Sequence, residues 1–80
     1  MEHILTHILL PGTGQCETFV LPTDIPFREM LSDIVSQMNA EPYVDQASCV
    51  LCDKQKHAAL DLNETVRSLN VKNGAVLLLC

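Results

Sequence analysis

The sequence predicts a small α+β domain in which one helix packs on a mixed sheet of four to five strands. The main observation is a run of apolar side chains at the spacing of one helical stripe: Phe27, Met30, Leu31, Ile34, Val35 and Met38. The flanking segments are short, apolar and rich in β-branched residues, with turn residues between them. No other stretch has good helical periodicity, so a single helix must cover a single sheet.

The helix has a recognisable start and end. Thr23 or Asp24 is expected to cap its free N–H groups, and Pro26 suits the first turn, where a missing N–H costs nothing. Asn39 and Pro42 are expected to end it. The side opposite the apolar stripe is polar, so the helix should bury only one face.

The strands are predicted from alternating apolar runs separated by turns. Residues 3–10 and 16–21 are expected to form a hairpin around the Pro-Gly-Thr-Gly turn at 11–14, and residues 41–46 form a loop after the helix. The second half of the chain is expected to contain a strand at 47–52, a turn at 53–56, a short strand at 57–60, a capped helical turn at 65–69, a turn at Asn73-Gly74 and a strand at 75–80.

Composition limits the possible functions. Eighty residues predict one domain spanning residues 1–80, and an apolar content of 48% predicts a folded core. Ten acidic against five basic residues give a net charge of −5, so nucleic acids and anionic membrane surfaces are poor partners. No apolar run approaches the ~20 residues of a membrane span. The N-terminus does not resemble a signal peptide, so we expect a cytoplasmic protein with reduced cysteines.

Two stretches resemble known proteins. The closing part of the chain resembles that of ubiquitin-like β-grasp domains through Leu60, Leu62, Thr65, Val66, Leu69, Val71, Gly74, Leu77 and Leu79. The stretch VLPTDIPFREML at residues 20–31 is similar to the strand-end and helix-start signature of YukD-like proteins, which are small ubiquitin-like components of bacterial type VII secretion systems. The cysteines and the hairpin at 53–59 depart from that family. The resemblance implies a β-grasp roll whose first and last strands are parallel neighbours.

The resemblance also implies a function. It indicates a non-catalytic, cytoplasmic accessory or regulatory module that docks on a protein partner such as an ATPase or a membrane subunit of the secretion machine. A conjugated modifier is not expected, because the chain ends Leu-Leu-Leu-Cys without the Gly-Gly tail that such proteins use. The alternatives are a ubiquitin-like adaptor unrelated to secretion and, from a different class, a thiol- or zinc-dependent redox or carrier protein.

Strand alternation predicts a candidate docking face. If the even-numbered residues of 3–10 face the helix, the odd-numbered ones face away from it, beside the outward residues of the last strand. The expected partner-binding residues on this outer face are Leu5, His7, Leu9, Val76 and Leu78. The alternative is that these strands are buried on both sides. His3 shares the face, and the histidine pair is interpreted as solvated surface, with a ligand or pH-sensing role as the alternative.

The cysteines supply a weak metal motif. Cys49 and Cys52 form a C-x-x-C pattern, with His57 following, and these three are the weak metal candidates. On a strand, residues three apart point to opposite faces, and no second pair completes a four-ligand set. We therefore expect no metal or other cofactor and interpret the thiols as small apolar packing residues. No nucleophile–base–orienter set or phosphate-binding glycine loop is present, so we expect no enzyme.

Overall fold

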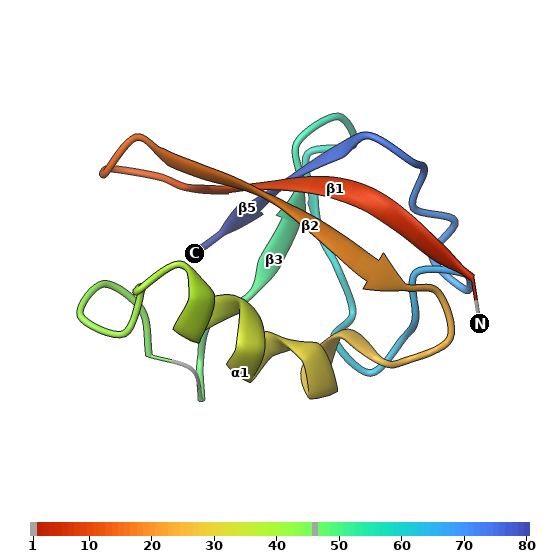
Figure 1. Cartoon of the computed structure of the whole chain (residues 1–80), viewed down its shortest axis with the longest axis horizontal. Helices are drawn as coiled ribbons and strands as arrows, with labels where there is room; N and C mark the ends of the chain where they lie inside the picture. The colour runs from red at the N-terminus through yellow and green to blue at the C-terminus, as the bar shows by residue number, and fades with distance from the viewer. Residues whose placement is uncertain (1, 46) are drawn as a thin grey trace.

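A computed structural model describes residues 2–45 and 47–80 of the chain as one helix packed against one face of a twisted sheet (Figure 1). The elements are β1 (His3–Leu10), β2 (Gln15–Pro22), α1 (Phe27–Gln37), β3 (Leu51–Asp53), β4 (Ala58–Ala59) and β5 (Ala75–Leu79). The five strands lie in the order β2-β1-β5-β3-β4, and β1 and β5 pair in parallel at the centre. The predicted α+β architecture with a mixed sheet is confirmed. Met1, and Gln46 of the expected 41–46 loop, lie outside the described residues.

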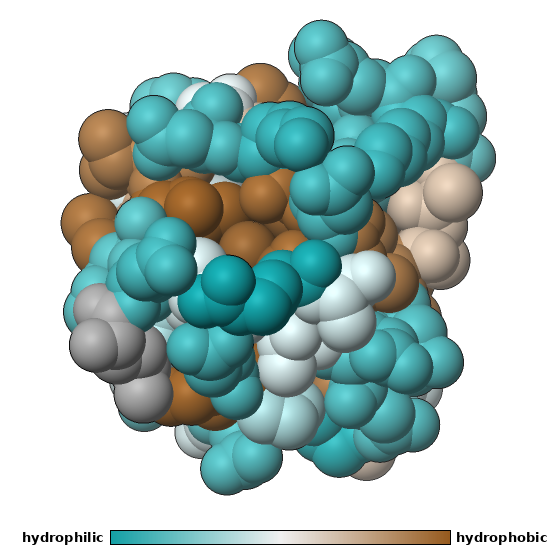
Figure 2. Space-filling view, turned by 90° about the vertical axis from the view of Figure 1, so that its right-hand side faces the viewer, coloured by the Kyte–Doolittle hydropathy of each residue, from teal (hydrophilic) through white to brown (hydrophobic). Residues whose placement is uncertain are grey.

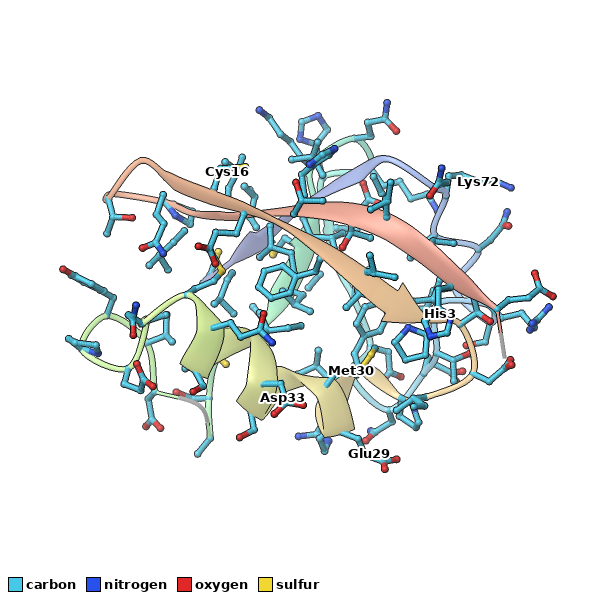
Figure 3. All side chains as sticks on the ribbon, in the orientation of Figure 1. His3, Cys16, Glu29, Met30, Asp33 and Lys72 are labelled. Atoms are coloured by element: carbon cyan, nitrogen blue, oxygen red, sulfur yellow. The ribbon has the colours of Figure 1, made fainter. Side chains whose placement is uncertain are left out.

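The core lies between α1 and the sheet. Phe27 and Met38, near the two ends of the apolar stripe, are both 0% exposed. Met30 turns toward the sheet, while Glu29 and Asp33 lie on the solvent side of the helix (Figure 3). From the sheet, alternate side chains of the two central strands complete the core: Thr6, Ile8, Leu10, Leu77 and Leu79, all buried. The predicted inward face of the strands is therefore correct.

The start of α1 is not capped by a side chain, so the expected capping by Thr23 or Asp24 is wrong. Pro26 occupies the N-cap position without a side-chain cap bond. The free N–H groups of Phe27 and Arg28 instead donate to backbone carbonyls of the 62–64 loop, at 3.1 and 2.8 Å. Buried N–H groups need partners, and a neighbouring loop supplies them as well as a cap would.

The two residues expected to cap the helix are held by Arg67 instead. The Arg67 backbone N–H donates to the Thr23 carbonyl at 3.1 Å, and its guanidinium bonds Asp24 at 2.7 Å and Glu2 at 3.3 Å. This set of bonds joins the start of the chain, the turn before α1 and the loop before β5. The hydrogen bond from Arg67 lowers the pKa of the Asp24 carboxyl below its ordinary value of 3.8.

The third strand begins later than the sequence predicts. Residues 47–52 were expected to be extended, but β3 spans Leu51–Asp53. The carbonyl of Asp45 accepts the N–H groups of Ser48 and Cys49 at 2.9 and 2.8 Å, so Ser48 and Cys49 turn back toward Asp45 instead of extending into a strand. The local turn therefore prevails over the apolar strand signal at this position.

The other short elements differ only at their ends. Of the strand expected at 57–60, Ala58–Ala59 forms β4, and the Leu60 N–H also donates to the Leu51 carbonyl at 2.7 Å. His57 has a φ of 54° and belongs to the preceding turn. The helical turn expected at 65–69 is present as one bond from the Leu69 N–H to the Thr65 carbonyl at 3.1 Å, without extending into a helix. The Asn73-Gly74 turn forms, with Gly74 at a φ of 86°.

Removal of one methyl group from the core tests the packing of α1. Ile34 is 2% exposed, so Ile34→Val should lower the free energy of unfolding by about 0.5–1.5 kcal/mol. Val20→Thr is the control, because Val20 is 61% exposed and threonine keeps its β-branched shape. Urea unfolding monitored by circular dichroism measures both variants. Equal stability of wild type and Ile34→Val would contradict the packing described.

The Asp24–Arg67 pair predicts a dependence of stability on pH. Because the folded pKa of Asp24 is lowered, its contribution is present above pH 3.8 and is lost as the pH falls through the folded value. Asp24→Asn should therefore be less stable than wild type at neutral pH, and the difference should shrink as the pH falls below 3.8. Asp33→Asn, which removes an exposed carboxylate with no ion pair in the described part of the chain, is the control. Thermal unfolding at a series of pH values measures the effect, and a difference independent of pH would refute it.

Candidate functional site

The face of the sheet opposite α1 brings the five predicted docking residues together. In the parallel β1–β5 ladder, His7 lies beside Val76 and Leu9 beside Leu78. Leu5 is 44% exposed, and the other four are half-buried. The outer face is therefore neither fully covered nor fully open to solvent. Strand alternation and the parallel register account for this placement.

The neighbouring strands add residues to this face that were not predicted from the sequence. Along β2, Val20, Thr18 and Cys16 pair with Leu5, His7 and Leu9, and Cys16 points away from the helix (Figure 3). The His7 Nδ1 and the Thr18 Oγ1 lie 3.1 Å apart, so a hydrogen bond orients the histidine ring. The outer face is defined here as the five predicted residues plus Cys16, Thr18, Val20, Val50, Cys52, Lys54 and Cys80. The missed residues become neighbours only through the pairing register, which no local sequence signal specifies.

The outer face carries no carboxylate, although the chain has ten acidic residues. Its polar border includes a hollow of about 370 Å³ between the β3–β4 turn and the start of β5, and Lys54, Lys72 and Val76 are among the residues that line it. Lys54 is held at this border by a backbone bond of 3.0 Å to the Val76 carbonyl. In the view onto one end of the molecule, apolar surface reaches the upper edge, away from α1, between hydrophilic side chains (Figure 2).

The weak metal candidates are not brought together. Cys49 is 5% exposed and packs in the core, Cys52 lies on the outer face, and His57 sits in the turn before β4. Burial raises the pKa of the Cys49 thiol. Within residues 2–45 and 47–80, no group of three or more His, Cys, Asp or Glu side chains is placed to hold a metal ion.

No helix in the described residues has the length and apolar character required to cross a membrane.

The fold and its half-exposed sheet face define a ubiquitin-like β-grasp domain. The sequence also matches, over residues 7–79, the family described as "WXG100 protein secretion system (Wss), protein YukD". The match spans nearly the whole chain, so the protein belongs to the YukD family, as the stretch at 20–31 predicts. The chain matches no curated protein.

Solved structures share the fold at low sequence identity. The ubiquitin-like domain of EccD5 from Mycobacterium xenopi is 19% identical, with a TM-score of 0.79 over 100% of this chain and 94% of that one. Ubiquitin from Caldiarchaeum subterraneum is 19% identical, with a TM-score of 0.77 over 98% and 91%. A chain in protomer 1 of the ESX-3 core complex is 22% identical, with a TM-score of 0.78 over 99% of this chain but only 16% of that much longer one.

The different burial of the thiols predicts different reactivity. Cys16 is exposed, whereas Cys49 is buried and its pKa is raised by desolvation. Iodoacetamide should therefore alkylate Cys16 on the order of tenfold or more faster than Cys49. Peptide mass spectrometry after timed quenching measures the two rates, and the same reaction in urea is the control, in which they should become similar. Equal rates in the folded protein would contradict the burial of Cys49.

Proposed function

We propose that this protein is a non-catalytic interaction module of a type VII secretion system, which docks through its outer face on a larger protein of the machine. The observation that carries the proposal is the half-exposed apolar surface across the two central strands, centred on Leu5, Leu9 and Leu78. Contiguous apolar patches on small domains are typical of binding surfaces. Membership of the YukD family supplies the secretion context.

The chemistry of the outer face indicates the partner's chemistry. An apolar centre without carboxylates, bordered by Lys54 and Lys72, complements a partner segment with apolar side chains and acidic flanks. The much longer chain of the ESX-3 core complex, which contains a domain of this fold, supports a partner within a multi-protein machine. The partner classes we propose are the ATPase and the membrane subunits of the apparatus.

We place this docking in the cytoplasm. Each of the four cysteines, all within the described part of the chain, is a thiol rather than half of a disulfide. Thiols persist in a reducing compartment, and disulfides are common in oxidising ones. This is consistent with a module that acts on the cytoplasmic side of the secretion machine.

Charge introduced at the centre of the outer face tests the proposal. Leu5→Asp and Leu78→Asp should each weaken binding to the purified ATPase or membrane subunit by at least roughly 30-fold, the effect of losing an interface hot spot. The reason is that a carboxylate would have to be desolvated against an apolar and acidic partner. Biolayer interferometry with the purified subunits measures the affinity, and circular dichroism verifies the fold of each variant.

The matched control is Asp33→Lys, a charge change on the solvent side of α1, which should leave the affinity unchanged. Unaltered binding by both leucine variants, or an equal loss in the helix variant, would overturn the docking proposal. Binding to neither purified subunit by the wild type would overturn the assignment of the partner classes.

A further inference from the structure

Two cysteines far apart in the sequence lie next to each other on the outer face. Cys52 pairs with Leu78 in the β3–β5 ladder, and Cys80 pairs with Val50 through two backbone hydrogen bonds of 3.1 and 3.0 Å. Cys52 and Cys80 are therefore diagonal neighbours on the same side of adjacent strands. Their side chains are in contact.

The pair is accessible yet partly shielded. Cys80 is exposed and Cys52 is half-buried, so a small ion reaches both sulfur atoms from solvent. Val50 and Leu78, their partners across the ladder, place apolar side chains on either side of the thiols. A site of two thiols within apolar surroundings favours soft cations over hard ones.

We propose that Cys52 and Cys80 form a two-sulfur site for a soft monovalent cation, with Cu(I) as the representative ion. Binding replaces two S–H bonds with two sulfur–metal bonds, both protons leave to the solvent, and no electron is transferred. Among the described residues no third His, Cys, Asp or Glu side chain completes a larger set. The site therefore suits an ion that binds with only two ligands.

The diagonal placement favours a bridging ion over a disulfide. Diagonal neighbours in an antiparallel ladder have Cα atoms roughly 7–8 Å apart. A disulfide needs Cα atoms within about 6.8 Å and sulfurs about 2 Å apart. Bonds of about 2.3 Å from each sulfur to a shared metal ion span a wider gap without moving the strands.

Titration of the fully reduced full-length chain with Cu(I), delivered without oxygen as its bicinchoninate complex, tests the site. The wild type should withdraw one Cu(I) per chain from the coloured complex. Cys52→Ser and Cys80→Ser should each weaken retention by more than the ~10–100-fold typical of losing an outer-shell partner, because a direct ligand is lost. Circular dichroism of each variant verifies that the fold is kept.

Cys16→Ser is the matched control. Cys16 is also exposed on the outer face, but β1 and β5 separate its strand from β3, so this variant should bind like the wild type. Equal retention by the Cys52 and Cys80 variants and the wild type would overturn the proposal, as would an equal loss in the Cys16 variant. Failure of the wild type to compete for Cu(I), with a Cys52–Cys80 disulfide forming instead on treatment with glutathione disulfide, would also overturn it. None of these readouts depends on the docking partner.

Discussion

The parallel pairing of β1 with β5 is the constraint on which the rest of the structure depends. Parallel neighbours cannot be joined by a tight turn, so residues 11–74 must leave β1 and return to its side through a long path. That path carries β2 along one edge, α1 across one face and β3 and β4 along the other edge. Because the only helix of the described chain covers one face, the opposite face of the same two strands is left without a covering layer.

Hydrogen bonds and ion pairs supplement the apolar packing on the covered side. The start of α1 donates its N–H groups to the 62–64 loop, and Arg67 links the turn before α1 to the start of the chain. A small domain has a small core, so such links matter for keeping the helix in one orientation. They join three segments that lie far apart in the sequence, and none of them involves a residue of the outer face.

The outer face has an unusual composition for a chain with a net charge of −5. Its strand positions carry apolar, thiol and neutral polar groups, with lysines at the border and no carboxylate. The acidic residues are placed elsewhere. Most lie in the loops or on the solvent side of α1, and the two in strands, Glu17 and Asp53, pair with the inward-facing residues Ile8 and Leu77. This segregation leaves one face suited to apolar contact. The proposed two-sulfur site lies within the proposed docking face, because Cys52 and Cys80 are outer-face residues and Cys52 pairs with Leu78.

The sequence by itself determined the helix, the first hairpin and the inward and outward residues of the central strands. These follow from local periodicity: the stripe from Phe27 to Met38 has the helical period, and residues 3–10 have the period of a strand. The stretch at 20–31 was also sufficient to indicate the YukD family. Five of the outer-face residues could be named for the same reason, although their role in docking stays a prediction.

Only the tertiary structure decided how the helix start is satisfied, where β3 begins and which residues meet across strands. Thr23 has a side chain that could cap the helix, but the N–H groups at the start of α1 donate to carbonyls of the 62–64 loop instead. Cys52 and Cys80 are separated by a long stretch of chain, and their contact depends on the register of β3 against β5. Register and loop docking are set by the free energy of the whole core, which no short window of sequence contains.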